Sequence, residues 1–351
     1  MYICSLFEKL MRYIGGKTDL LCNINAACAN SNAQSVIDIF SGSGAVSQNF
    51  AKTGIKVISN DLLFFSYVIN RALITVSELP SYDNLPINNP IDYLNSLEFQ
   101  NSGIDINDCF IWQNYSLHDG CSRMYLQEHN ALKIDIIRLT IESWKNRGLL
   151  SENEYYYLLS RLLAAVPGIS NIAGVYGAYL KFWDPRSFKP LLLTDYVQPF
   201  AMNTDNIAYN QDYKLTLKSV SADLLYADPP YNSRQYLPNY HILETIARYD
   251  YPTIHGVSGM REYNRNDKSD FCSKSKVSTA FEDLIKLADV GHILISYNNE
   301  GLMPTDSLYE LCRSYSKDDT FQFIQIPYRR YKSNEGEERQ VFEQLYYFAK
   351  K

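Results

Sequence analysis

The chain has 351 residues, of which 46% are hydrophobic and 21% are charged. This supply of apolar side chains predicts a folded protein, built either as two domains or as one large domain with an insertion. With 33 Lys and Arg against 39 Asp and Glu, the net charge is -6, which excludes a protein that is basic over its whole surface, such as a histone-like DNA packager. A local basic groove is still compatible with this charge, because the field in a cleft depends on where the charges lie.

Cysteine and histidine spacing shows no metal-binding pattern. The seven cysteines contain no CxxC pair, and the five histidines show neither HExxH nor zinc-finger spacing. An odd number of scattered cysteines predicts free thiols in a reducing compartment. Residues 1–13 lack the basic start of a signal peptide, and no uncharged apolar stretch reaches transmembrane length. We therefore expect no metal, no membrane association and a cytoplasmic location.

The first predicted elements form a βαβ unit. Residues 35–40 are predicted as an apolar strand that runs into the turn Ser41-Gly-Ser-Gly44. A helix over 45–54 and a second strand over 55–61 follow, and an apolar helix over 62–74 comes next. A strand, a glycine turn, a helix and a strand in this order are typical of the start of a parallel sheet.

The pattern changes between residues 75 and 206, where loops rich in Asn and Pro lead to two predicted helices. These helices are placed at 132–146 and 151–166, and the second begins with Ser-Glu-Asn-Glu, a capping-box sequence. We therefore predict an α/β fold in which one domain, formed by 11–74 and 207–351, is interrupted by a mostly helical insertion at 75–206.

The sheet is predicted to resume after the insertion. Its remaining strands are placed at 222–227 and 290–296, and residues 321–326 and 344–349 are expected to form a terminal hairpin. The polar segment 251–277, which carries Arg261, Arg265, Lys268, Lys274 and Lys276, is expected to be a mobile loop.

The glycine turn after the first strand has two interpretations. It is not a G-x-G-x-x-G dinucleotide motif, because Ser47 stands in the third glycine position. Its glycines still allow a ligand to approach the backbone, and Asp61 ends the next strand where an acid can accept both hydroxyls of a ribose. The alternative is a plain tight turn with a helix-capping aspartate. The segment Gly15-Gly-Lys17-Thr is not a P-loop, because Met11 occupies the required first glycine position.

Asp228-Pro229-Pro230-Tyr231 is the most informative segment, because it follows a buried strand at the edge where α/β proteins bind ligands. Two prolines fix the backbone and supply no N–H group. The carboxylate of Asp228 and the carbonyl of Pro229 are then held as two acceptors, which suits the polarisation of a planar exocyclic amine for attack on a methyl group. Tyr231 offers a ring on which an extruded base can stack. The alternative is that the prolines only end the strand.

These motifs, taken in order, resemble a known family. The order of Arg12-Tyr-Ile-Gly-Gly-Lys17, Asp38-Ile-Phe-Ser-Gly-Ser-Gly44, Ser59-Asn-Asp61 and Asp228-Pro-Pro-Tyr231 is similar to the alpha group of adenine-N(6) DNA methyltransferases, and more narrowly to type II modification enzymes of restriction systems. Further similar stretches are Gly174–Lys181, Asn232–Ala247, Tyr328–Lys332 and Glu343–Phe348, so the resemblance spans nearly the whole chain.

The resemblance implies a Rossmann-like sheet that binds S-adenosyl-L-methionine. It places Tyr13 and Lys17 at the methionine end of the cofactor, Phe40 and Gly42 in the turn beneath it, and Asp61 at its ribose. Asp228 would touch both cofactor and target. The implied cofactor-binding set also contains Asp38, Gly44 and Asp212, the last of these at the adenine of the cofactor. Position 13 is Tyr where some members have Trp. Residues 1–10 are expected to be either dispensable or a start-site artefact.

The resemblance also implies the reaction and the partner. A target adenine in a specific short sequence of double-stranded DNA would be flipped onto Tyr231 and methylated at its exocyclic amine, mainly through proximity and orientation. The DNA contacts follow from residue chemistry instead. Base readout needs Arg, Lys, Asn or Gln on a groove-facing element, for which the insertion at 75–206 is the best candidate. Arg234 and Gln235, which follow the catalytic motif, could fill the hole left by the base, and Arg329, Arg330 and Lys332 form a cationic run suited to phosphates. Each of these side chains is alternatively a solvated surface group.

Other readings of the same motifs differ in the substrate or in the activity. The methylated amine could instead be N(4) of cytosine, or an amine of RNA or of a protein amide. A second alternative is a DNA-binding regulator that has the same fold but no catalytic activity. Asp at position 228 and the order of the motifs favour adenine. We expect a bacterial or phage-encoded monomer, with a possible cognate restriction endonuclease that acts on the same site without forming a stable complex.

Overall fold

The computed structural model describes residues 15–196, 201–264, 268–328 and 341–351. Four residues with predicted roles, Tyr13, Arg329, Arg330 and Lys332, lie outside the described residues.

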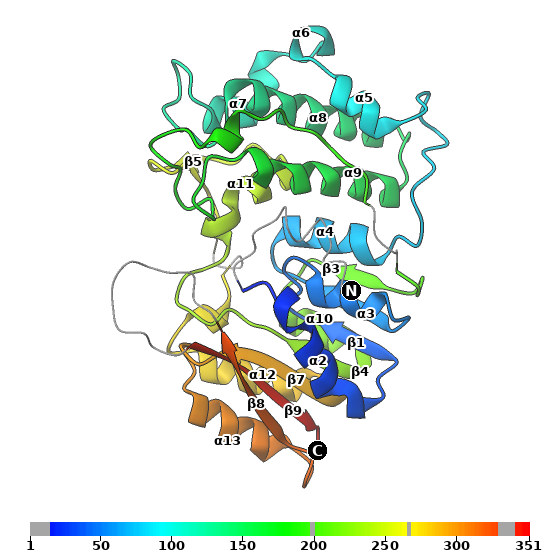
Figure 1. The fold of residues 1–351 in the computed structure, drawn as a ribbon, viewed down its shortest axis with the longest axis vertical. Coiled ribbons are helices and arrows are strands. Elements are labelled where there is room, and N and C mark those ends of the chain that lie inside the picture. The colour runs from blue at the N-terminus through cyan, green and yellow to red at the C-terminus, as the bar shows by residue number, and fades with distance from the viewer. Residues whose placement is uncertain (1–14, 197–200, 265–267, 329–340) are drawn as a thin grey trace.

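A seven-stranded sheet in the order β3-β2-β1-β4-β7-β9-β8 is the centre of the fold (Figure 1). Its strands are β1 (Ser35–Asp38), β2 (Lys56–Asn60), β3 (Ile207–Tyr209), β4 (Ser221–Ala227), β7 (Asp289–Asn298), β8 (Gln322–Tyr328) and β9 (Val341–Ala349). The strands from β3 to β7 pair in parallel, whereas β9 runs antiparallel to both of its neighbours. The chain therefore moves outward from β1 to β3 and then returns to the other side of β1, which creates a topological switch point between β1 and β4.

Alternating side chains of the strands supply two separate apolar cores. Val36 and Leu224 contribute to one core, whereas their chain neighbours Ile37 and Leu225 contribute to the other. This alternation follows from the two-residue period of a strand, and it requires helices on both faces of the sheet.

Helices cover both faces. The face of the first core carries α2 (Leu21–Cys28), α3 (Ala45–Ala51), α4 (Phe64–Ile74) and α11 (Leu237–Arg248), and the face of the second core carries α10 (Tyr213–Ser219), α12 (Val277–Leu287) and α13 (Thr305–Tyr315). No helix in the described part of the chain is both long enough and apolar enough to cross a membrane.

The helices between residues 75 and 196 form a layer beyond α4, at the end of the molecule opposite α13 (Figure 1). Residues 202–206 return to the sheet, where the N–H of Met202 donates to the carbonyl of Ala51. Its helices are α5 (Pro90–Ser96), α6 (Phe99–Ser102), α7 (Phe110–Tyr115), α8 (Glu128–Asn146) and α9 (Glu152–Ala165). Helix α9 packs against both α4 and α11. The first core continues without a break from the sheet into this layer, because α4 has buried residues around most of its circumference.

The predicted strands of the central sheet and the terminal hairpin are confirmed, with ends shifted by a few residues. The capping box is also confirmed: Ser151 accepts from the backbone of Glu154, and the Glu154 side chain accepts from the backbone of Ser151. Helix α8 begins at Glu128, four residues before the predicted start at 132. The short edge strand β3 was not predicted, and neither were α10 to α13.

The expectation of a polar loop over 251–277 is wrong for its first part. Strands β5 (Ile254–His255) and β6 (Met260–Arg261) form a hairpin there. Arg261 is buried and forms a bidentate ion pair with Asp250. A buried guanidinium needs such a partner, because an isolated buried charge is strongly unfavourable. The six cysteines among the described residues are all free thiols, as expected.

Candidate active site

A deep cleft lies at the topological switch point and encloses about 980 Å³ of empty space, its open mouth included. Its walls contain most of the residues that the sequence placed around a cofactor, namely Lys17, Asp38, Phe40, Gly42, Asp61, Asp212 and Asp228. These residues come from five separate segments of the chain. Parallel strands bring them together because their carboxyl ends meet at one edge of the sheet.

The glycine turn between β1 and α3 forms the floor of the cleft. Gly42 and Gly44 both have positive φ, of 50° and 80°, which side chains of other residues rarely adopt. A Cβ atom at Gly44 would lie 2.8 Å from Oδ1 of Asn70, whose amide nitrogen donates to the carbonyl of Gly42 at 3.1 Å. Gly44 is thus packed against α4 behind the wall, and Gly42 faces the cleft.

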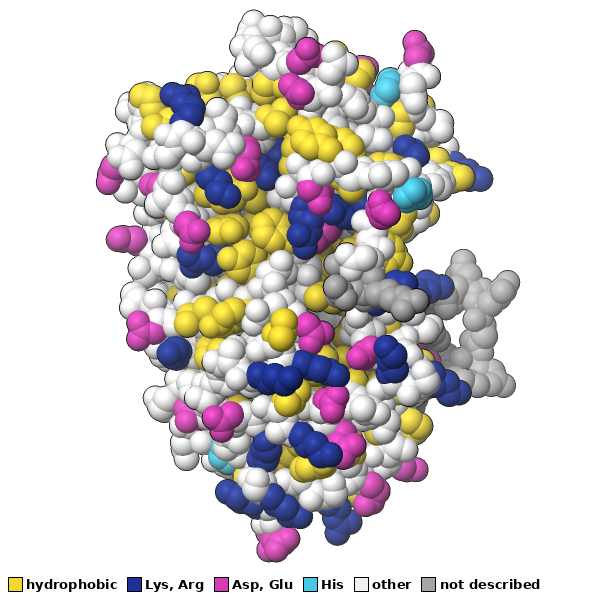
Figure 2. All heavy atoms as spheres, turned by 180° about the vertical axis from the view of Figure 1, so that it is seen from behind, with side chains coloured by type: hydrophobic (Ala, Val, Ile, Leu, Met, Phe, Trp, Pro, Cys, Tyr) yellow, Lys and Arg dark blue, Asp and Glu magenta, His cyan; other side chains and the backbone are white. Residues whose placement is uncertain are grey.

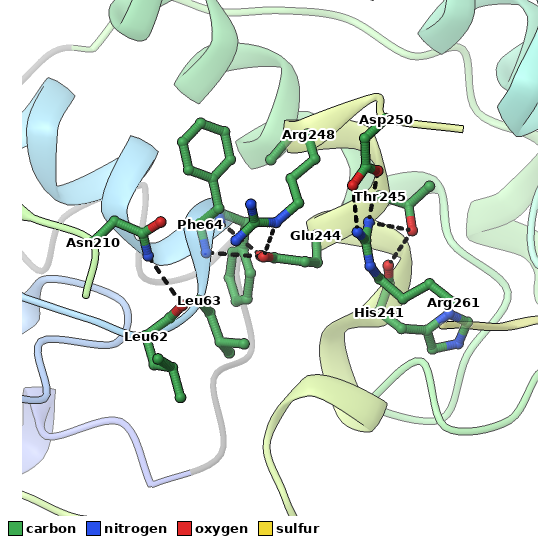
Figure 3. A network of polar contacts seen from close by, with 12 residues as sticks. Leu62, Leu63, Phe64, Asn210, His241, Glu244, Thr245, Arg248, Asp250 and Arg261 are labelled. Atoms are coloured by element: carbon green, nitrogen blue, oxygen red, sulfur yellow. Dashed lines mark hydrogen bonds and ion pairs between the residues drawn. The ribbon is translucent and has the colours of Figure 1, made fainter. Parts of the chain in front are cut away.

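Asp61 is held at the end of β2 by backbone groups. Its carboxylate accepts from the N–H groups of Gly42 and Leu63, each at 2.8 Å. Burial raises the pKa of Asp61 to about 6, although these N–H bonds oppose the rise. The side-chain amide of Asn210 donates to the carbonyls of Asp61 and Leu62, which fixes the same segment from the side of β3 (Figure 3).

A buried carboxylate on α11, that of Glu244, binds the chain segment that runs from Asp61 into α4. Glu244 accepts from the backbone N–H groups of Phe64 and Phe65, at 3.0 and 2.9 Å, in the first turn of α4 (Figure 3). Arg248 donates to the same carboxylate at 2.6 Å, and its guanidinium lies over the ring of Phe64. A negative charge at the amino end of a helix is stabilising, so Glu244 ties α11 to the segment that carries Asp61.

Asp38 presents an unused acceptor at the cleft. Its side chain is buried, and Oδ2 accepts from the hydroxyl of Ser47 at 2.6 Å. Oδ1 has no hydrogen-bond partner among the described residues. Burial raises the pKa of Asp38 to about 7, and the nearby Asp228 and Asp61 contribute to the rise. An unpartnered buried carboxylate oxygen fits a cofactor that brings an amino group, as S-adenosylmethionine does.

The ammonium of Lys17 joins two carboxylates at the other end of the cleft. It lies 2.9 Å from Oδ2 of Asp228 and 3.2 Å from Oε1 of Glu343, and both Lys17 and Glu343 are buried. Burial alone would lower the pKa of Lys17, but the two carboxylates outweigh it and raise the pKa above its usual value. The side chain of Asp228 is 21% exposed and faces the cleft, so it remains accessible to a ligand.

The rest of the Asp-Pro-Pro-Tyr segment follows directly after β4. Pro229 is buried, whereas Pro230 and Tyr231 are half-buried and only Pro230 lines the cleft. The carbonyl of Tyr231 accepts from the N–H of Leu302 at 2.8 Å, which anchors the segment to the loop after β7. Tyr236, at the start of α11, also lines the cleft and stacks on Tyr240.

Phe40 and Asp212 lie toward the β3 side of the cleft. The ring of Phe40 packs against Tyr213 and Phe271 at centroid distances of 5.7 and 5.2 Å. Asp212 caps α10 by accepting from the N–H of Lys214 at 2.9 Å. The cleft wall here combines the rings of Phe40 and Tyr213 with the carboxylates of Asp212 and Asp270, a composition that suits a nucleoside.

Two predicted DNA contacts have distinct surroundings. Arg234 is exposed, and its backbone N–H binds the side chain of Asn232. Both ends of the Gln235 amide are bonded to the backbone of Ser269, at 3.1 and 2.8 Å. The role of Gln235 at DNA stays a prediction, and in the structure its amide holds a neighbouring loop against the cleft.

The sheet order, the glycine turn and the Asp-Pro-Pro-Tyr segment together define a Rossmann-like, S-adenosylmethionine-dependent methyltransferase. Residues 13–311 match the model of the D12 class N6 adenine-specific DNA methyltransferases, and the chain belongs to this family. The earlier resemblance is thereby confirmed, and the family implies S-adenosylmethionine as methyl donor.

Several curated proteins are similar over most of the chain. The type II methyltransferase M.FokI of Planomicrobium okeanokoites is 42% identical over 97% of this chain and 53% of its own length. The modification methylase StsI of Streptococcus sanguinis is 40% identical over 97% of this chain and 52% of its own length. The chain thus spans about half the length of these two relatives. The type II methyltransferase M.NlaIII of Neisseria lactamica is 38% identical, with 94% of this chain and 95% of its own length covered.

Two acidic residues of the site were missed as such from the sequence. Both lay only within stretches of resemblance, Asn232–Ala247 for Glu244 and Glu343–Phe348 for Glu343, and no role was predicted for either. Glu343 directly precedes the strand predicted at 344–349, and a carboxylate buried beside such a strand needs a partner. Its partners Lys17 and Ser296 are remote in sequence, so their identity depended on the tertiary structure.

Proposed function

We propose that this chain transfers the methyl group of S-adenosylmethionine to the exocyclic amine of adenine in a specific short sequence of double-stranded DNA, after flipping the base. The observation that carries the proposal is the placement of Asp228 and Pro230 on the wall of the same cleft as Asp38 and Asp61. A cofactor and a planar amine can therefore meet at one edge of the sheet.

Asp228 and the Pro229 carbonyl are proposed to accept the two N–H bonds of the amine. This draws the nitrogen lone pair out of conjugation with the ring, and the amine attacks along the line of the methyl group. The new nitrogen–carbon bond forms as the carbon–sulfur bond breaks, and the proton then leaves to water or a nearby acceptor. The rate comes mainly from proximity and orientation, so Asp228 is not required to act as a strong base.

S-adenosylmethionine supplies an electrophilic methyl group on a sulfonium when it is bound. Asp61 is proposed to hold its ribose, Asp38 and Lys17 its methionine part, and Asp212 with Phe40 its adenine. Tyr231 is proposed to stack on the flipped base. Gly42 allows the close approach that this arrangement needs.

DNA recognition is assigned to residues 75–206, with 11–74 and 207–351 as the catalytic domain. Arg234, Gln235, Arg329, Arg330 and Lys332 are proposed as DNA contacts. The face in Figure 2 carries Lys and Arg interspersed with Asp and Glu, without a large area of one sign. The attraction to phosphates is therefore assigned to local groups rather than to the protein's overall field.

The test is transfer of a tritiated methyl group to DNA, followed by identification of the modified base and its sequence. We expect N6-methyladenine at one short site. Asp228→Ala should lower transfer at least about a hundredfold, with the fold retained because Glu343 still neutralises Lys17. Asp318→Ala, in an exposed turn before β8, is the matched control.

Three outcomes would overturn parts of the proposal. Label in cytosine or in RNA alone would refute the adenine assignment. DNA binding without any transfer would refute the enzymatic activity. Full activity of Asp228→Ala would show that the reaction takes place elsewhere. Sedimentation of the active protein tests the accompanying proposal that it acts as a monomer, and addition of a candidate endonuclease tests whether the two form a stable complex.

A further inference from the structure

The Lys17 ammonium contacts acceptors from three different parts of the fold. Its three N–H groups face Oδ2 of Asp228 at 2.9 Å, Oε1 of Glu343 at 3.2 Å and the carbonyl of Gly15 at 3.0 Å. Such a cluster carries two negative charges and one positive charge. It is therefore not a simple ion pair, and one carboxylate exceeds what is needed to neutralise the lysine.

Glu343 is built into the sheet in a way that fixes its carboxylate. It lies on β9, opposite Asn298 of β7, and is only 4% exposed. Ser296, two residues earlier on β7, donates its hydroxyl to Oε1 of Glu343 at 2.6 Å. A carboxylate at a buried strand position is unfavourable unless it is compensated. The hydroxyl of Ser296 and the ammonium of Lys17 supply that compensation. The bond from Ser296 holds the carboxylate in the orientation in which it contacts Lys17.

We propose that Glu343 is a positioning residue that shares the charge of Lys17, so that Asp228 keeps the hydrogen-bonding capacity needed to polarise the target amine. A lysine paired with Asp228 alone would form a neutral pair and compete with the amine for the same carboxylate. With Glu343 present, the cluster retains a negative charge beside the amine. The positive charge that develops on the amine during transfer is then stabilised. This inference rests on the proposed function.

The charged groups around Asp228 determine the sign of the pH effect. Asp228 faces Lys17 and Glu343, and Asp38, Tyr226 and Tyr236 are also electrostatically coupled to it. Burial raises the pKa of Asp228 to about 6, Lys17 lowers it, and Glu343 raises it. Removing the charge of Glu343 should therefore lower the pKa of Asp228, and the loss of activity on acidification should begin at lower pH.

The test compares the wild-type chain with Glu343→Gln in single-turnover methyl transfer to adenine between pH 5 and 9. We expect the plateau rate to fall about tenfold, with cofactor affinity changed much less. We also expect the acid limb to move down by about one pH unit. Ser296→Ala keeps the carboxylate of Glu343 but removes the hydrogen bond that orients it. The plateau rate and the pH of the acid limb should therefore change in the same direction as in Glu343→Gln, by a smaller amount. Glu310→Gln on the exposed face of α13 removes the same charge and should leave both unchanged.

A wild-type plateau and acid limb in Glu343→Gln would refute the inference. A lower rate with an unmoved acid limb would also refute it, because that result describes a merely structural role. If circular dichroism shows that Glu343→Gln does not fold, Ser296→Ala decides between these outcomes. A wild-type chain that transfers no methyl group to adenine would instead refute the proposed function, so the two failures are distinguishable.

Discussion

The bond between Glu244 and the amino end of α4 leads to a quantitative prediction. Replacing Glu244 with Gln keeps the shape of the side chain but leaves one carbonyl oxygen where two carboxylate oxygens accepted from Phe64 and Phe65. One buried N–H then faces an NH₂ group, and an unsatisfied buried donor is destabilising by about 1–3 kcal/mol. The favourable interaction of a negative charge with the helix end is also lost, at about 0.3–1 kcal/mol.

Loss of the ion pair with Arg248 adds little to these two contributions, because the Arg248 side chain is 35% exposed and can be rehydrated. We therefore expect Glu244→Gln to lower the free energy of unfolding by about 3 kcal/mol, measured by urea unfolding at pH 7. Affinity for S-adenosylmethionine, measured by calorimetry, should fall as well, because the segment that carries Asp61 loses its support.

The matched control is Glu282→Gln. Glu282 forms an ion pair with Lys286 at the same i,i+4 spacing as Glu244 with Arg248, but its side chain is 42% exposed and accepts from the Tyr315 hydroxyl rather than from backbone N–H groups. Its urea midpoint should stay close to that of the wild type. A loss below about 1 kcal/mol for Glu244→Gln, or equal effects of the two substitutions, would refute the reasoning that the backbone bonds to α4 carry the stabilisation.

Three further predictions concern the glycine turn, a buried acid and a phosphate contact. Because burial raises the pKa of Asp38 from 3.8 to about 7, the folded state holds this proton more tightly, and stability falls as pH rises through that range. Asp38→Asn should remove the contribution of Asp38 to this fall, with those of Asp61 and Asp228 remaining, and should raise the thermal midpoint at pH 8. An unchanged pH dependence of thermal unfolding would contradict it. Gly44→Ala should destabilise by about 2 kcal/mol in urea, because φ is 80° and the new methyl group would meet Asn70; a neutral result would show that the turn relaxes. Arg330→Ala should reduce the slope of log affinity for DNA against log salt by about 0.9, and an unchanged slope would remove it from the phosphate contacts.

The positions of most strands along the chain, and several of the segments that end at the cleft, could be predicted from local pattern. The β1 strand, its glycine turn and β2 follow from apolar runs punctuated by glycine, because burial on both faces requires continuous apolar strands. Asp228 to Tyr231 could be identified from the chemistry of its four residues. Strand β3 and helix α11 could not be predicted in this way. β3 has only three residues, and α11 contains a non-helical residue, Tyr240, that interrupts the helical periodicity of its apolar residues.

The charge of the chain illustrates what only the tertiary structure decided. The sequence determined the net charge of -6 and the motifs of a methyltransferase. It did not determine that Lys17 is shared by Asp228 and Glu343, or that Glu244 binds the end of α4. Ion pairs and helix caps between segments far apart in the chain have no spacing rule that a sequence can reveal. The fold determines which of these residues become partners, because parallel strands place residues from distant parts of the chain at one edge of the sheet. Burial there makes each unpaired charge unfavourable, so the charged groups must pair.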